Sequence, residues 1–235
     1  MSADSSSSIC VIGFDLDETL WSLEGVIERA NQQTWAFLMA KAPAISVSGL
    51  SQHQSPNKAA IEARFEHHIS NKRLHLMHDL LTQSGLNDAQ AWSIARNAMD
   101  VFMRHRHELT LYDGVLEGLR ELTQRFALAS ISNGNAQVSE VPELKGLFDF
   151  SINAEDLNSS KPAPDLFHAT CDYLKCTPSS MVYVGDNLVC DVFAPHKLGI
   201  RAIWMNWHGR ASTDQTVPHE AHDFSELLAL IDTLD

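Results

Sequence analysis

The stretch that decides the fold of this chain reads Ile9-Cys10-Val11-Ile12-Gly13-Phe14-Asp15-Leu16-Asp17-Glu18-Thr19-Leu20. Residues 9–15 form a short apolar, β-rich run, which predicts a buried parallel strand. Two acids follow where that strand should end. Asp15 and Asp17 are two residues apart, so in an extended chain their side chains point the same way. Because paired carboxylates raise each other's pKa, this arrangement favours a bound cation.

Four further apolar runs predict strands at Phe126–Ser132, Phe150–Asn153, Met181–Asp186 and Arg201–Met205. Helix-like stretches alternate with them, at Gly114–Arg125, Asp165–Leu174 and Val189–Leu198. Alternating strands and helices predict an α/β fold, with a Rossmann-like parallel sheet and helices on both faces.

The interval from about Ser22 to Thr110 has a different pattern. Its apolar residues recur at helical spacing, and no stretch in it predicts a convincing strand. Roughly four helices are expected there. We therefore predict an α/β core made of residues 1–20 and 111–235, with an all-α cap, residues 21–110, inserted after the first strand.

Composition limits the partners and the compartment. The 235 residues carry a formal net charge of −13, with 17 Lys and Arg against 30 Asp and Glu, which disfavours binding to nucleic acid. The apolar runs are far shorter than the roughly 20 residues needed to span a bilayer. Four scattered cysteines form no C-x-x-C pair and no zinc spacing, so we expect reduced thiols in a cytoplasmic protein.

Polar residues that suit phosphate chemistry follow the predicted strands. Ligands of open parallel sheets bind beyond the carboxyl ends of the strands, so these residues are expected to meet at one edge. Asp15, Asp17 and Asp186 form a hard-oxygen site suited to Mg²⁺. A lysine supplies a positive charge, and a serine hydroxyl and backbone N–H groups can hold an anion. The set comprises Asp15, Asp17, Ser132, Asn133, Gly134, Lys161, Asp186, Asn187 and Asp191.

The order of these pieces resembles the haloacid dehalogenase-like superfamily. Asp15–Leu20, which includes Thr19, fits the first motif of that family, and Ser132 fits the second. Lys161 fits the third, and Gly185-Asp186-Asn187 with Asp191 fits the fourth. The helical insertion looks like the type 1 cap of the family. The stretch Ser-Asn-Gly-Asn-Ala at 132–136 resembles the branch that includes riboflavin-precursor phosphatases.

The resemblance implies a role for each matching residue. Asp15 would attack phosphorus and form an aspartyl-phosphate, while Asp17 would serve as general acid and then as general base. Phosphate binding falls to Ser132, Asn133 and Lys161. The metal ligands would be Asp15, the backbone carbonyl of Asp17, and Asp186. Asp191, Asn187 and Thr19 would support these groups.

The resemblance thus implies a Mg²⁺-dependent phosphatase for a small phosphorylated metabolite. Candidate substrates are 5-amino-6-(5-phospho-D-ribitylamino)uracil, a nucleoside 5′-monophosphate or a sugar phosphate, and the protein is expected to be a monomer or a homodimer. A phosphomutase of the same fold and a non-catalytic phospho-acceptor switch remain alternatives. Family members that dehalogenate lack the acid two places after the nucleophile, so Asp17 favours phosphate chemistry.

Taken singly, each motif also fits a bland interpretation. Aspartates favour turns after strands, Ser-Asn-Gly is a common turn sequence, and Lys161 alone would fit a surface lysine. Only the four motifs in order, each after a predicted strand, indicate a catalytic site.

Overall fold

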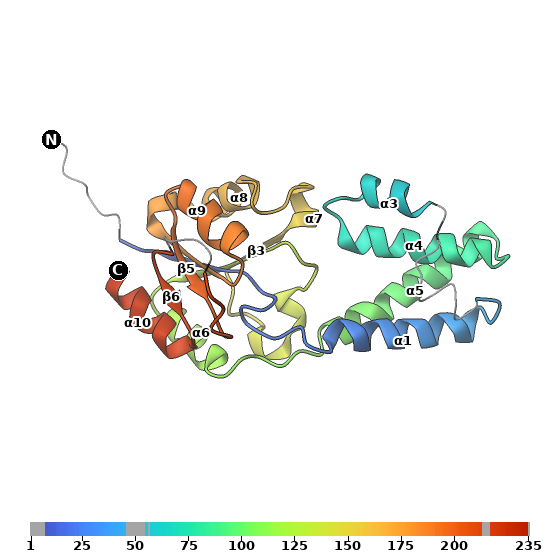
Figure 1. The fold of residues 1–235 in the computed structure, drawn as a ribbon, viewed down its shortest axis with the longest axis horizontal. Helices are drawn as coiled ribbons and strands as arrows, with labels where there is room; N and C mark the ends of the chain where they lie inside the picture. The colour runs from blue at the N-terminus through green and yellow to red at the C-terminus, as the bar shows by residue number, and fades with distance from the viewer. Residues whose placement is uncertain (1–7, 46–54, 56, 213–216, 235) are drawn as a thin grey trace. The chain divides into compact units, whose positions relative to one another are not determined.

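A computed structural model shows the fold of the chain (Figure 1). It describes residues 8–45, 55, 57–212 and 217–234. The chain divides into two compact units. One, here called the core unit, comprises Met1–Ser22 and Thr110–Asp235, and the other, here called the helical unit, comprises Leu23–Leu109.

The core unit is built on a six-stranded parallel sheet with the strand order β3-β2-β1-β4-β5-β6. The strands are β1 Val11–Phe14, β2 Ala127–Ser132, β3 Phe150–Asn153, β4 Met181–Gly185, β5 Arg201–Met205 and β6 Glu220–Ala221. In the register, Val11 pairs with Ala127 on one side and with Met181 on the other, so β1 lies in the middle. The order reverses between β1 and β4, and such a switch point places a ligand crevice at the carboxyl ends of these strands.

Helices cover both faces of this sheet (Figure 1). On one face lie α8 (Asp165–Leu174) and α9 (Ala194–Lys197), and Phe167 of α8 belongs to the apolar cluster there. On the other lie α6 (Val115–Leu122) and α10 (Phe224–Leu234), where the ring of Phe224 stacks on that of Phe14 with 6.3 Å between centroids. Burial on both faces explains the continuous apolar run of β1. The predicted α/β fold with a parallel sheet is confirmed.

Short helices complete the connections of the core unit. They are α7 Ala154–Leu157, the 3₁₀ turns η1 Val138–Glu140, η2 Pro142–Leu144 and η3 Pro178–Ser180, and the π-helical turn η4 Leu188–Phe193.

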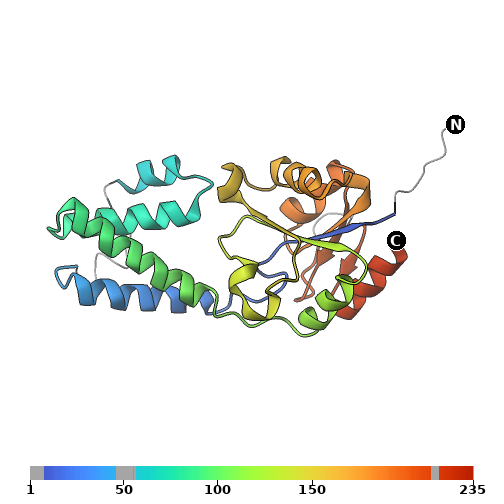
Figure 2. The same ribbon diagram turned by 180° about the vertical axis from the view of Figure 1, so that it is seen from behind.

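The described part of the helical unit holds four α-helices and no strand: α1 Val26–Lys41, α3 Lys58–Arg64, α4 Ile69–Gln83 and α5 Asp88–Arg106. Helix α5, green in Figure 2, packs against both α1 and α4. It does so through the small side chains of Ala91, Ala95 and Ala98, which are fully buried and recur at helical spacing. The side chain of Asn87 caps the start of α5 by accepting the N–H of Gln90.

No helix in the described ranges combines the length and the apolar character that crossing a membrane requires.

The structure differs from the sequence-based expectation at two places in the core unit. The helix predicted at Val189–Leu198 consists of η4 and then α9. Asn187 caps η4, because its side-chain oxygen accepts the N–H groups of both Val189 and Cys190. Strand β6 was not predicted, since two residues are too few to give an apolar pattern.

Candidate active site

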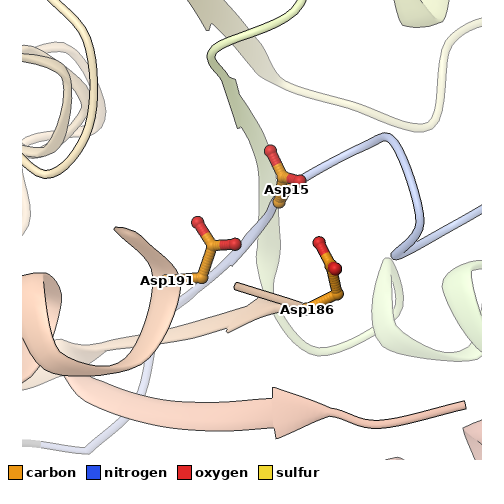
Figure 3. Close-up of side chains that lie close together, drawn as sticks. All are labelled: Asp15, Asp186 and Asp191. Atoms are coloured by element: carbon orange, nitrogen blue, oxygen red, sulfur yellow. The ribbon is translucent and has the colours of Figure 1, made fainter. Parts of the chain in front are cut away.

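Three carboxylates gather at the carboxyl edge of the sheet, close to the switch point (Figure 3). Asp15 directly follows β1, Asp186 directly follows β4, and Asp191 lies in η4. One oxygen from each carboxylate lies within 4.8 Å of the others. In Figure 3 the three carboxylate groups point to the same side. Folding therefore brings together acids as distant in the sequence as Asp15 and Asp191, which are 176 positions apart.

Asp15 is held rigidly and is nearly buried. Its N–H donates to the carbonyl of Val184 at 2.9 Å, which extends the pairing of β1 with β4 by one residue. The residue is 8% exposed. Burial raises the pKa of Asp15 to about 7, against the opposing charge of Lys161, with Asp191 and Asp17 adding to the rise. An additional cation at the site would favour the ionised form, which is the nucleophilic one.

Lys161 connects two of the acids, Asp15 and Asp191, through hydrogen bonds. Its Nζ donates to Asp15 Oδ1 at 2.8 Å, to Asp191 Oδ1 at 2.7 Å and to the hydroxyl of Tyr183 at 2.7 Å. An ammonium group has three N–H donors, so all of them are used. Burial works to lower the pKa of Lys161, but the charges of Asp15 and Asp191 outweigh it and hold the pKa well above its ordinary value. The lysine is therefore a fixed positive charge.

Asn133 fixes the backbone on which Lys161 sits. Its Nδ2 donates to the carbonyl of Lys161 at 2.8 Å, and its Oδ1 accepts the N–H of Lys161 at 2.8 Å. The side chain of Asn133 is thus engaged with the loop that carries the lysine. Its backbone N–H is the part that remains for the phosphate-binding role predicted from the sequence.

Ser132 and Gly134 form the turn at the end of β2. The N–H of Gly134 donates to Ser132 Oγ at 3.0 Å, and the serine hydroxyl retains its own proton to donate. A Cβ on residue 134 would lie 2.7 Å from Asp17 Oδ2 and 3.4 Å from Ser132 Oγ. Only glycine lets the two polar side chains approach the backbone here.

Asp17 lies beside these residues but outside the cluster of three carboxylates. The indole Nε1 of Trp21 donates to Asp17 Oδ1 at 2.8 Å, and Glu18 between them has a left-handed φ of 60°. Thr19, which is 1% exposed, accepts the indole N–H of Trp207 at its carbonyl, with 3.0 Å between the atoms. Thr19 therefore supports the turn through its backbone.

Asp186 and Asp191 differ in the groups that hold them. Both oxygens of Asp191 accept hydrogen bonds, Oδ1 from Lys161 and Oδ2 from the N–H of Asn187 at 3.0 Å. Among the described residues, Asp186 accepts a side-chain hydrogen bond at Oδ2, from Arg210 Nη2 at 3.0 Å. Burial raises the pKa of Asp186, and Arg210 opposes that rise. Asp186 is thus the better metal ligand of the two, and Asp191 the better support for Lys161.

The donors fit a magnesium ion. Clustered carboxylate oxygens are the hard ligands that Mg²⁺ prefers, and the accumulated negative charge beside one lysine favours a further cation. The acids, the turn after β2 and Lys161 line a cavity of about 250 Å³. That volume is below the range typical of ligand pockets, roughly 300–1,000 Å³, and suits a phosphoryl group better than a whole metabolite.

Three partners of the site were not found from the sequence. Tyr183 holds Lys161, Trp21 holds Asp17, and Arg210 holds Asp186. Tyr183 lies inside a predicted apolar strand, and its hydroxyl was the one feature in the sequence that could have indicated a polar partner there. Arg210 lies in a loop, and nothing local marks it.

Comparisons with known proteins agree with this geometry. The family described as haloacid dehalogenase-like hydrolase matches residues 9–199. The chain is 29% identical to 5-amino-6-(5-phospho-D-ribitylamino)uracil phosphatase YigB of Escherichia coli (strain K12) over 202 residues, 84% of this chain and 83% of YigB. It is 31% identical to N-acylneuraminate-9-phosphatase of Mus musculus over 134 residues, about half of each chain (54%).

A solved structure is also similar over its whole length. The 2-haloacid dehalogenase from Pseudomonas syringae pv. Tomato DC3000 superimposes with a TM-score of 0.89 at 30% identity, covering 97% of this chain and 100% of that one. The family match spans every motif from Asp15 to Asp191. The expectation of a hydrolase enzyme is confirmed, and the chain belongs to the haloacid dehalogenase-like hydrolases.

Proposed function

We propose that this protein is a Mg²⁺-dependent phosphatase that hydrolyses a small phosphorylated metabolite through an aspartyl-phosphate on Asp15. One observation carries the proposal: a single buried lysine binds both Asp15 and Asp191, with Asp186 close to both. This arrangement holds a carboxylate nucleophile in a fixed position next to a place for a cation. Neutralising charge and fixing geometry are what phosphoryl transfer mainly requires.

Each residue contributes a separate part of the reaction. A free oxygen of Asp15 attacks phosphorus in line, and the P–O bond to the leaving alcohol breaks. Asp17 gives that alcohol a proton, and then takes one from the water that attacks the aspartyl-phosphate. Having given up its proton in the first step, Asp17 is ionised and can accept one from water in the second, so one carboxyl group serves as acid and then as base.

Lys161 and Ser132 bind the group being transferred. All three N–H donors of Lys161 are used within the protein, one of them by Asp15. As Asp15 gives up its negative charge to the new bond, that donor can pass to a phosphoryl oxygen, while Asp191 and Tyr183 keep the ammonium in place. The hydroxyl of Ser132 and the N–H of Asn133 donate to the same group.

Mg²⁺, held by Asp15, Asp186 and the carbonyl of Asp17, would neutralise phosphoryl charge when bound. The role of the protein is to keep these oxygens fixed beforehand. The lining of the cavity by Asp15, Asp17 and Asp186 supports this ligand set.

The substrate class is proposed from the similarity to named phosphatases. YigB is named for 5-amino-6-(5-phospho-D-ribitylamino)uracil, and the mouse relative for an acylneuraminate 9-phosphate. Both names describe a phosphate ester on a polyhydroxylated carbon chain. We propose a substrate of that kind, with the ribitylamino-uracil phosphate as the first candidate and nucleoside 5′-monophosphates or sugar phosphates next.

The helical unit and the setting of the protein belong to the same proposal. We propose that residues 21–110 act as the cap that selects the leaving group. The four cysteines are free thiols, which supports the proposed cytoplasmic location.

Dehalogenation is the second candidate, because the similar structure from Pseudomonas syringae bears the name of a 2-haloacid dehalogenase. Asp17 argues against it. Attack on a carbon–halogen bond releases halide, which needs no proton from a general acid, and the Trp21 indole holds Asp17 close to the cavity.

Phosphate release from an aryl phosphate and a panel of metabolite phosphates tests the function, with Mg²⁺ or with chelator. Halide release from a 2-haloacid runs in parallel. We expect multiple turnovers with a phosphate ester that need Mg²⁺ and vanish in Asp15→Asn, and no halide. Activity that survives in Asp15→Asn, or halide release without phosphatase activity, would contradict the proposal.

A further inference from the structure

We propose that Arg210 is a positioning residue that orients Asp186 and thereby sets the affinity of the site for Mg²⁺. The inference rests on the proposed function, because it takes Asp186 as a metal ligand. It concerns a residue outside the four motifs, in the loop after β5.

Arg210 contacts Asp186 at two atoms. Its Nη2 lies 3.0 Å from Asp186 Oδ2 and 3.4 Å from the carbonyl oxygen of the same residue. The indole Nε1 of Trp204 donates to that carbonyl at 2.8 Å. Together these bonds fix both the backbone and the side chain of Asp186. They place a donor on Oδ2 and leave Oδ1 for a cation.

The position of Arg210 is itself fixed by a buried amide. Asn206 is 1% exposed, its Nδ2 donates to the carbonyl of Arg210 at 2.9 Å, and its Oδ1 accepts the N–H of Arg210 at 2.9 Å. Its second N–H is used by Glu220 Oε1 at 2.6 Å. A loop arginine held only by solvent would have no such anchor.

The same arrangement occurs on the other side of the site. Asn133 binds the backbone N–H and carbonyl of Lys161 just as Asn206 binds those of Arg210. Each asparagine follows a strand of the sheet, and each secured cation then contacts an acid of the cluster. This parallel indicates that Arg210 belongs to the site and is not an incidental surface contact.

Two effects of Arg210 on a bound cation oppose each other. Its charge repels Mg²⁺, but the side chain is 50% exposed, so water and salt screen that repulsion. Its hydrogen bond keeps the 16% exposed carboxylate of Asp186 in one orientation, which avoids an ordering cost when the metal binds. Removing such an outer partner of a metal ligand weakens metal affinity by about 10–100-fold. We therefore expect orientation to outweigh repulsion.

Calorimetric titration of the full-length, metal-free protein with MgCl₂ tests this directly. Arg210→Gln removes the charge and shortens the side chain, Arg210→Lys keeps a charge and N–H donors without the planar guanidinium, and Arg120→Gln is the control. Arg120 is exposed on α6, away from the cluster. We expect Arg210→Gln to raise the Kd for Mg²⁺ about 10-fold, Arg210→Lys to lie between it and the wild type, and the control to match the wild type.

Two further readouts separate positioning from a general structural effect. The melting temperature of Arg210→Gln should match that of Arg120→Gln, since both side chains are exposed. The Mg²⁺ concentration that gives half-maximal phosphate release should rise by the same factor as the Kd. An unchanged or tighter Kd in Arg210→Gln would overturn the proposal.

Failure of the proposed function gives a different result. If Asp186→Asn binds Mg²⁺ as tightly as the wild type, the metal site itself is misassigned, and the role of Arg210 falls with it. If Mg²⁺ binding depends on both residues but no phosphate is released, the inference about Arg210 stands and the phosphatase activity does not.

Discussion

Replacement of Tyr183 by phenylalanine tests how the buried Lys161 is held in place. The tyrosine hydroxyl accepts a hydrogen bond from Lys161 Nζ and donates one to the carbonyl of Ile131, each at 2.7 Å. The ring packs edge-on against Phe167, with 5.0 Å between centroids. Phenylalanine keeps that packing, so the substitution removes two hydrogen bonds and little else.

The expected loss of stability follows from the groups left behind. The Ile131 carbonyl and one N–H of Lys161 would remain buried without their partner. Each unsatisfied buried group costs about 1–3 kcal/mol, and a charged group costs more than a neutral one. Taking roughly 1 kcal/mol for the carbonyl and roughly 2 kcal/mol for the ammonium, we expect the core unit to lose about 3 kcal/mol.

Urea denaturation of the whole protein measures this loss. With an m value of about 1.5–3 kcal/mol/M, the unfolding midpoint of the core unit should fall by about 1–2 M. Tyr173→Phe is the matched control, because Tyr173 is 61% exposed on α8 and its ring stacks on Phe150 at 4.3 Å. Its midpoint should correspond to a change within about 0.5 kcal/mol.

Equal stability of Tyr183→Phe and Tyr173→Phe would contradict this prediction. That result would mean that the Tyr183 hydroxyl contributes nothing to the fixed position of Lys161. A drop in phosphatase activity together with the loss of stability would link the hydroxyl to the chemistry as well.

Three more predictions concern the turn after β2, the helical unit and the metal. Gly134→Ala places a Cβ 2.7 Å from Asp17 Oδ2. Because the Cβ displaces that carboxylate, kcat/KM should fall about 100-fold, and wild-type kinetics in this variant would contradict the prediction. Burial, aided by the charge of Arg64, lowers the pKa of His75 in the folded state, so the unfolded chain binds the proton more tightly. The stability of the helical unit should therefore fall as the pH drops below the ordinary value of 6.5, and His75→Gln should lose part of that dependence in urea titrations; an identical pH dependence in both proteins would refute it. Mg²⁺ at a hundred times its Kd should stabilise the protein by about 2.7 kcal/mol in the same assay, and a chelator should reverse this; an equal gain in Asp186→Asn would argue against the site.

The parallel sheet could be predicted because its strands depend on local composition. Residues of β1 and β4 are buried on both faces, and a continuous apolar run is the direct sequence consequence. The two-residue β6 carries no such pattern, because it forms only where the chain comes back beside β5 in the folded structure. The π-helical form of η4 depends on the Asn187 side chain binding two N–H groups at once, which spacing alone does not reveal.

The same distinction holds for the site. Asp15, Ser132 and Asp186 were found because the carboxyl end of a parallel strand is a place that sequence can identify. Tyr183, 22 positions from Lys161, and Arg210, 24 positions from Asp186, contact their partners only through tertiary packing. No local pattern encodes those contacts, so the groups that hold Lys161 and Asp186 became visible only in the structure.

Phosphorylation of Asp15 during turnover can be tested directly. Acid quenching of the enzyme while it turns over a substrate, followed by borohydride reduction, converts an aspartyl-phosphate into homoserine that peptide mass spectrometry can locate. We expect homoserine at position 15 in the wild type and none in Asp15→Asn. Phosphate release with position 15 unmodified, or with the modification at another acid, would contradict it.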